Sequence, residues 1–130
     1  MADSTDPYEW LRYAEADLSP SRIVPPVGVF LELLCYHAQR ATEKAIKAVM
    51  LARGSSIRKT HDINLLVELV VGAGAAALPL SREAAESLTL FAVLSRYPSD
   101  LGDVDEAEWQ RAVGDAAAVV AWARAELERA

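Results

Sequence analysis

The chain has 130 residues, of which 52% are hydrophobic and 25% are charged, and its formal net charge is −6 at pH 7. This length predicts a single domain that spans residues 1–130, and the acidic balance argues against indiscriminate nucleic-acid binding. The sequence has neither an apolar run of bilayer length nor a signal-peptide pattern at its start, so we expect a cytoplasmic protein with no membrane partner.

The first two predicted helices are separated by a pair of prolines. Asp6 is a suitable N-cap for the first helix, which should end near Leu18 because a Ser-Pro pair follows. The second helix is predicted from about Val27 to Arg53, which is roughly 40 Å at the rise of an α-helix. Gly54 is the expected C-cap.

The second helix carries a packing seam. Small and apolar residues recur along it at alternating steps of three and four, the spacing of a helix that packs against other helices. These residues are Leu31, Leu34, Ala38, Ala41, Ala45, Ala48 and Ala52. Because most of them are alanine, we expect neighbouring helices to approach the seam closely.

Four nitrogen-bearing side chains, here called the basic stripe, follow an adjacent face of the second helix. They are His37, Arg40, Lys44 and Lys47, which lie three or four residues apart and therefore project together. We expect the stripe to be reachable and to attract anions, with Lys44 suited to hold a phosphate as a point charge. The alternative is a solvated helix face, and Glu43 with Lys47 also fits a simple surface ion pair.

Each of the two histidines has two interpretations. His37 could be a general base or an anion ligand, or a hydrogen-bonded core residue at the edge of the seam. His61 could act in catalysis, or it could be a loop residue whose ring bonds to the backbone. Asp62, which follows it, is better explained as an N-cap than as an acid catalyst.

Two shorter helices are expected after this loop. Thr60 or Asp62 begins the third helix, which two glycines weaken near residue 72. Ser81 caps the fourth helix, which is predicted to run to Ser95.

The segment after the fourth helix contains the strongest single candidate, Arg96. Pro98 stops the helix and leaves Arg96 and Tyr97 at its carboxyl end. Arg96 could contact a phosphate in bidentate fashion and stabilise developing charge, while Tyr97 could stack on a base. Alternatively, Arg96 neutralises the carbonyl end of its own helix and Tyr97 packs as a hinge.

The last helix begins at Asp105 or Asp103 and carries a regular apolar stripe to the carboxyl terminus. Five helices with short connections predict an all-α fold, an antiparallel up-and-down bundle of four to five helices. Trp10 and Trp109 are expected in the core or a dimer interface, and Trp122, which lies off the stripe, in an interface.

The sequence offers no obvious group for metal or covalent chemistry. Cys35 is the single cysteine, lies among apolar residues and is expected to be a buried, inert thiol. There is no cluster of zinc ligands and no glycine-rich phosphate loop. We therefore expect no metal and no cofactor.

Several segments together resemble the HEPN domain family. They are YEWLRYAEADL at the start, CYHAQRATEKAIKAVM in the second helix, RKTHDINLLVEL after Gly54, and SRYP after the fourth helix. The similarity covers nearly the whole chain. It implies a bundle of four or five antiparallel helices that is usually dimeric.

The resemblance also implies a function and partners. HEPN proteins of this size are commonly encoded beside a minimal nucleotidyltransferase, as the presumed toxin of a toxin–antitoxin pair, and many HEPN proteins are metal-independent ribonucleases. We therefore expect a homodimer, a nucleotidyltransferase partner and a nucleotide or RNA ligand. The candidate binding residues are Arg40, Lys44, Lys47, Arg96 and Tyr97, and the candidate catalytic residues are Arg96, His61 and His37.

One departure from the family pattern leaves enzymatic activity open. The ribonuclease signature is an arginine followed after four to six residues by a histidine, whereas Arg96 is followed by YPSDLGDVDE. Two alternatives therefore stand beside RNA or nucleotide binding. The chain could be a non-catalytic interaction module, or a substrate for nucleotide transfer at Tyr97 or another hydroxyl.

Overall fold

A computed structural model describes residues 4–24, 31–94 and 104–129 of the chain. Within these ranges the protein is all-α. Its helices are α1 (Pro7–Ser21), α2 (Leu31–Ala52), α3 (Ile63–Gly72), α4 (Arg82–Leu94) and α5 (Glu106–Arg129). The predicted helical bundle is therefore confirmed, and its elements follow the predicted order.

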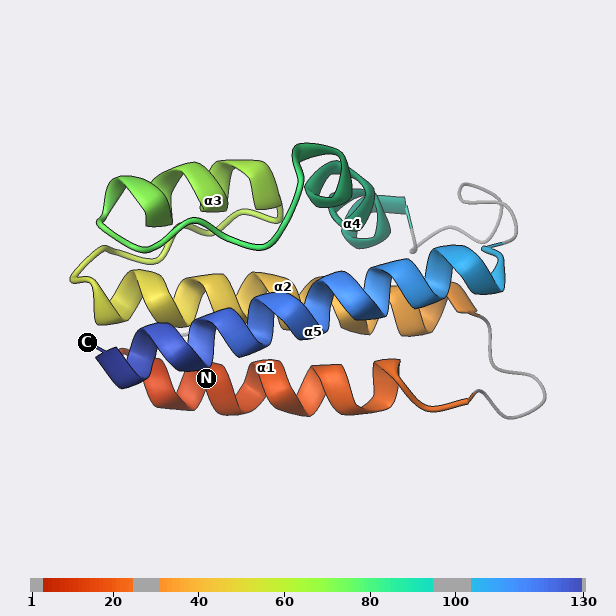
Figure 1. Cartoon of the computed structure of the whole chain (residues 1–130), viewed down its shortest axis with the longest axis horizontal. Coiled ribbons are helices and arrows are strands. Elements are labelled where there is room, and N and C mark those ends of the chain that lie inside the picture. Colours follow the sequence, from red (N-terminus) through yellow and green to blue (C-terminus); the bar gives the residue numbers. More distant parts are fainter. Residues whose placement is uncertain (1–3, 25–30, 95–103, 130) are drawn as a thin grey trace.

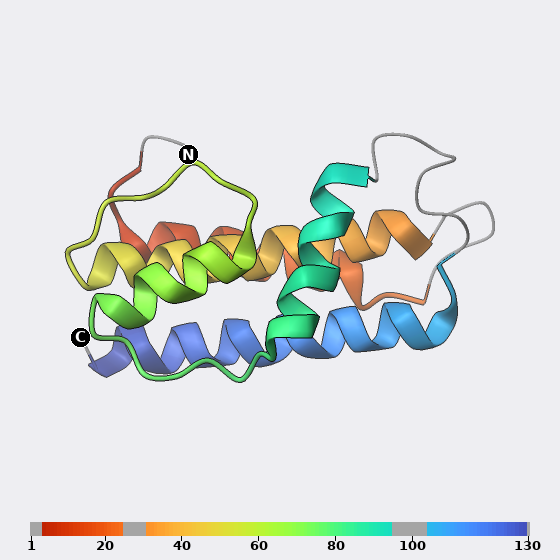
Figure 2. The ribbon, with the colours of Figure 1, turned by 90° about the horizontal axis from the view of Figure 1, so that it is seen from above.

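Helix α2 lies at the centre of the bundle. It packs against each of the other four helices, with α1 and α5 running alongside it and α3 on the opposite side from α1 (Figure 1). Seen from above, α4 crosses the long helices at a steep angle instead of running along them (Figure 2). Its far end passes above α2, and α4 contacts α2, α3 and α5.

The alanine seam explains why α2 can occupy this position. Ala38, Ala41, Ala45 and Ala48 are completely buried, as the spacing predicts. Small side chains let helices approach closely, and the larger side chains that fill the space come from the neighbours. Trp10 of α1 and Trp109 of α5 are both buried in this core.

Local capping signals fix most of the helix starts as predicted. Backbone N–H groups of the first turns donate to the side chains of Asp6 (3.0 Å), Asp62 (3.3 Å), Ser81 (3.0 Å) and Asp105 (2.7 Å). At the end of α2, Gly54 has a φ of 78°, and Ser55 N–H donates to the Met50 carbonyl at 2.9 Å. This is the left-handed closure that favours glycine.

The end of α1 differs from the prediction. The helix continues through Pro20 to Ser21 instead of stopping near Leu18. Pro20 lacks an N–H and its ring crowds the preceding turn, but the final turn is held because the Trp109 indole donates to the Ser21 carbonyl at 2.7 Å. Ser21 Oγ also donates to the Leu18 carbonyl at 2.6 Å. Tertiary packing therefore overrides the local stop signal.

A buried carboxylate ties the carboxyl end of α5 to two other elements. Glu126 is completely buried, and its Oε1 accepts from Arg53 Nη2 and from the Ala76 N–H, each at 3.0 Å. Arg129 forms a further ion pair with it. Trp122, expected at an interface, donates its indole N–H to the Ala76 carbonyl of the same chain at 3.2 Å.

The fold also bears on the expectations for the Cys35 thiol and for membrane-spanning helices. Cys35 is completely buried, and burial, followed by the nearby charges of Glu108 and Glu32, raises the pKa of its thiol to about 12. Over the ranges described, none of the helices combines the length and apolarity that a bilayer span requires. The predicted start of α2 near Val27 and end of α4 at Ser95 lie outside the described residues.

Candidate functional site

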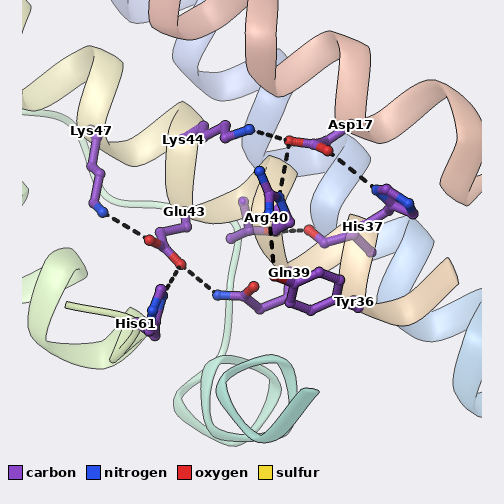
Figure 3. Close-up of polar contacts among 11 residues, drawn as sticks. Asp17, Tyr36, His37, Gln39, Arg40, Glu43, Lys44, Lys47 and His61 are labelled. Atoms are coloured by element: carbon purple, nitrogen blue, oxygen red, sulfur yellow. Dashed lines mark hydrogen bonds and ion pairs between the residues drawn. The ribbon is translucent and has the colours of Figure 1, made fainter. Parts of the chain in front are cut away.

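Asp17 of α1 gathers three members of the basic stripe. Its Oδ2 accepts from Lys44 Nζ at 2.6 Å and lies 3.7 Å from Arg40 Nε, while Oδ1 lies 3.2 Å from His37 Nδ1 (Figure 3). The Asp17 side chain is only 13% exposed. Helix α1 therefore covers this part of the stripe and partly neutralises it.

Aromatic rings flank two of these cations. The Arg40 guanidinium lies 5.5 Å from the Tyr36 ring centroid and donates from Nη1 to the Tyr36 hydroxyl at 3.2 Å. Lys44 Nζ lies 5.7 Å from the centroid of Tyr13 on α1. The hydrogen bond to Tyr36 is the main cause that raises the pKa of Arg40. Both side chains thus combine a positive charge with an adjacent aromatic face.

Glu43 forms a second cluster one helical turn away. Its Oε2 accepts from Gln39 Nε2 at 2.6 Å and lies 3.0 Å from His61 Nδ1, and its Oε1 accepts from Lys47 Nζ at 2.8 Å (Figure 3). Glu43 is 8% exposed and Lys47 is 7% exposed. The ion pair expected on the surface is therefore a buried one.

The hydrogen bonds decide the charge state of Glu43. Burial on its own would raise the pKa of this carboxyl group, but the hydrogen bonds from Lys47 and His61 outweigh it and hold the pKa below the usual value. Glu43 is consequently ionised at neutral pH. An ionised carboxylate can only accept, so the bonded ring nitrogen of His61, Nδ1, carries a proton.

The basic stripe is therefore paired with carboxylates instead of standing open. Arg40, Lys44 and Lys47 contribute three positive charges, and Asp17 and Glu43 contribute two negative charges. These five side chains together carry a formal net charge of +1. The expectation of an accessible stripe is therefore wrong for Lys44 and Lys47, whose side chains are 15% and 9% exposed, whereas those of His37 and Arg40 are 40% and 42% exposed.

A groove of about 770 Å³ opens beside Lys47 and His61. Its walls come from the segment before α1, the end of α2 and the loop before α3. Trp10, Leu51 and Ile57 supply apolar surface, and Lys59 and His61 supply exposed polar ends. The hydroxyl-bearing residues at this groove are Ser4, Thr5, Ser55, Ser56 and Thr60.

The structure separates the two histidines. His61 lines this groove, its side chain is 57% exposed, and its ring bonds to a carboxylate and not to the backbone. His37 pairs with Asp17 instead and is 40% exposed. The two rings therefore belong to different clusters, and the third predicted catalytic residue, Arg96, lies outside the described residues together with Tyr97.

The acceptor that the sequence predictions missed is Asp17. Asp17 follows Trp10 and Ala14 at steps of four and three, so it lies at the edge of the packing face of α1. That spacing was a readable signal for a carboxylate directed toward α2. Lys59, for which no role was predicted, also lines the groove.

The chemistry available here is proton transfer and anion binding. In the parts of the chain that the structure describes, no group of three or more histidine, cysteine, aspartate or glutamate side chains is placed to hold a metal ion. The polar groups present are a carboxylate-bonded imidazole, lysines and hydroxyls. These suit phosphate contact and acid–base chemistry.

The comparisons with known proteins gave one positive result. Residues 8–126 match the model of the HEPN domain, which covers all five helices almost completely. Searches of curated proteins and of solved structures gave no significant match.

Proposed function

The chain belongs to the HEPN domain family, and we propose that it is an RNA- or nucleotide-binding protein whose ligand occupies the groove beside Lys47 and His61. The composition of that groove carries the proposal. A base can pack against Trp10 and Ile57 while Lys59 and nearby hydroxyls contact phosphate. The volume of about 770 Å³ falls within the range of roughly 300–1,000 Å³ that is usual for small-molecule sites.

A pair of neighbouring lysine and arginine substitutions tests the site. Lys59 lines the groove, whereas Arg58 is exposed on the same loop and is not among the lining residues found in the described chain. Fluorescence anisotropy with a labelled single-stranded RNA should show weaker binding by Lys59→Gln, by about three- to tenfold, and little change for Arg58→Gln. Competition with unlabelled mononucleotide then separates nucleotide binding from RNA binding.

Two results would contradict the proposed site. Equal losses in the two variants would mean that only the overall charge of the loop matters. Absence of binding by the unaltered protein at low salt, where phosphate contacts are strongest, would remove RNA and nucleotides as ligands.

The proposal includes a partner and a biological setting. We infer that the chain acts with a nucleotidyltransferase, as the presumed toxin of a toxin–antitoxin-type pair, and that it forms a homodimer. The HEPN resemblance supports the partner, the setting and the dimer.

Inducing the chain alone should slow growth, and co-expression of a nucleotidyltransferase partner should restore growth. Copurification tests the complex, and light scattering tests the dimer.

A non-catalytic interaction module is the second candidate, and the ion pairs favour it. Asp17 and Glu43 already satisfy most of the basic stripe, which leaves less charge for RNA. This candidate predicts a stable complex with the partner and no RNA affinity.

A third candidate is nucleotide transfer onto Tyr97 or another hydroxyl. It predicts that the protein gains the mass of one or more nucleotides when the partner is co-expressed.

A further inference from the structure

The carboxyl end of α5 is bonded to both walls of the groove of about 770 Å³. One wall is the segment before α1, with Ser4 and Thr5, and the other is the stretch after α2 that includes residues 54–57. The start of α1 and the ends of α2 and α5 lie at the same end of the bundle (Figure 1). Among the described residues, none of those that line the groove belongs to α5. Helix α5 can therefore affect a ligand there only by positioning the walls.

The contact with the wall after α2 runs through Arg53. Its Nη2 donates to Glu126 Oε1 at 3.0 Å, and the next residue, Gly54, is the first of the wall residues 54–57. The N–H groups of Gly54 and Ser55 donate to carbonyl groups of α2 at 3.0 and 2.9 Å. Because this turn is bonded so closely to the helix end, a shift of Arg53 reaches the groove wall within two residues.

The contact with the wall before α1 runs through Tyr8. Its hydroxyl donates to the Leu127 carbonyl at 3.2 Å, which is one of the last four carbonyl groups of α5 and so has no partner within its own helix. Two residues further along α1, the Trp10 indole donates to the Ser4 carbonyl of the wall at 2.9 Å. Two consecutive residues of α5, Glu126 and Leu127, are thus connected to the two walls.

Glu126 also holds the connection between α3 and α4. The same Oε1 accepts from the Ala76 N–H at 3.0 Å, and the Trp122 indole donates to the Ala76 carbonyl at 3.2 Å. Glu126 is completely buried, whereas Ala76 is exposed. One buried oxygen is therefore shared between this connection and Arg53. Because a buried carboxylate is stabilised by the donors that it keeps, a change at one donor alters the bond to the other.

We propose that the carboxyl end of α5 positions the groove walls, and that Glu126, acting through Arg53, couples the groove to the α3–α4 connection. The inference rests on the proposed function, because RNA is the ligand whose affinity is affected. Walls that are held in place spare the ligand the cost of ordering them. Coupling between two sites is reciprocal. A ligand in the groove should therefore stabilise the bond to Ala76, and a partner that displaces the connection should weaken ligand binding.

Binding measurements test the positioning role. Glu126→Gln keeps the shape of the side chain and removes the charge that pairs with Arg53, so anisotropy with a labelled single-stranded RNA should show binding weaker by about fivefold. Arg53→Gln should cause a similar loss. The double variant should show no further loss, because the effects of residues that act through each other are not additive. Tyr8→Phe removes only the hydroxyl at the other wall and should weaken binding by about threefold.

Leu18→Ala is the control for a general loss of stability. Leu18 is buried in the last turns of α1, and that end of the helix lies away from the groove walls (Figure 1). The cavity should destabilise the chain but leave the RNA affinity of the folded protein within about twofold. A loss of affinity equal to that of Glu126→Gln would mean that stability alone explains the effect, and would overturn the inference.

Hydrogen exchange followed by NMR measures the coupling itself. Without ligand, Glu126→Gln should speed exchange of the Gly54 and Ser55 N–H groups, and Leu18→Ala should do so less. Adding RNA should slow exchange of the Ala76 N–H in the unaltered protein. The same RNA should leave that exchange unchanged in Arg53→Gln, because this variant removes the link between the groove wall and Glu126.

The outcomes separate this inference from the function on which it rests. RNA binding that leaves exchange at Ala76 unchanged, or losses that add in the double variant, would overturn the inference while the binding function stands. Absence of RNA binding by the unaltered protein would overturn the proposed function, and unchanged exchange at Gly54 and Ser55 in ligand-free Glu126→Gln would then overturn the positioning role as well. Should Glu126→Gln not fold, normal affinity in Tyr8→Phe would overturn it.

Discussion

Nδ1 of His61 lies 3.0 Å from Oε2 of Glu43, although the two residues are 18 positions apart in the chain. Glu43 is on the central helix, and His61 is on the loop that leads into α3. Their contact closes this loop against α2 and places the imidazole at the edge of the groove. A single carboxylate thus links the packing of the bundle to the candidate site.

The first prediction concerns acid stability. The pKa of Glu43 is lower in the folded chain than its ordinary value of 4.5, which is also the value expected after unfolding. Its contribution is therefore complete above pH 4.5 and is lost as the pH falls through the lower folded value. Glu43→Gln should reduce the free energy of unfolding at pH 7 by about 2 kcal/mol, and the difference from the unaltered protein should shrink in acid.

Urea denaturation at a series of pH values measures this difference. The exposed residue Glu68 of α3 supplies the control, because Glu68→Gln removes the same charge with little loss of stability. A Glu43→Gln deficit that stayed constant from pH 7 to pH 3 would show that the ionised carboxylate is not what stabilises the fold.

The second prediction concerns the carboxylate that neutralises the basic stripe. Asp17→Asn keeps the shape of the side chain but removes the charge that pairs with Lys44 and Arg40. We expect RNA binding to become about threefold tighter, with a steeper salt dependence, and stability to fall by about 2 kcal/mol. Anisotropy titrations at several salt concentrations measure the first effect.

A second charge removal on α1 serves as the comparison. Glu15 forms an exposed ion pair with Arg124 of α5, so Glu15→Gln makes the same change in net charge away from the stripe. Tighter RNA binding by both variants would trace the effect to net charge alone. Weaker binding by Asp17→Asn would mean that Asp17 orders the site for its ligand.

The third prediction concerns the thiol. Since the pKa of Cys35 is about 12, only about one thiol in ten thousand is ionised at pH 8, and the side chain is completely buried. A chromogenic disulfide reagent should react with the native protein only as fast as the chain opens. It should react at once in guanidinium chloride. Immediate reaction of the native protein would contradict the packing around α2.

The fourth prediction concerns the buried carboxylate at the end of α5. Glu126→Ala would leave Arg53 and the Ala76 N–H without this acceptor. We expect it to lower the free energy of unfolding by about 3–5 kcal/mol, as measured by urea denaturation. The neighbouring exposed residue Glu128 provides the control variant Glu128→Ala, which should change stability by less than about 0.5 kcal/mol. Similar losses in both would contradict a buried ion pair.

Much of the fold was determined by the sequence alone. Helix positions, capping residues and the buried alanine seam depend on neighbours three or four residues apart, so their signals are local. The N-cap roles of Asp6, Asp62 and Ser81 are confirmed. The end of α1 was predicted too early, because the contact that holds Ser21 comes from Trp109, 88 positions away.

Only the tertiary structure decided which charges on different elements meet. Lys44 and Asp17 are 27 positions apart, and His61 and Glu43 are 18 apart, so no helical spacing relates them. Their pairing depends on the way α1 and the loop before α3 pack on α2, which local periodicity does not specify. For this reason the sequence predicted a basic stripe and the Glu43–Lys47 pair. The packing of the helices determined that Asp17 also pairs with the stripe and that His61, not His37, borders the groove.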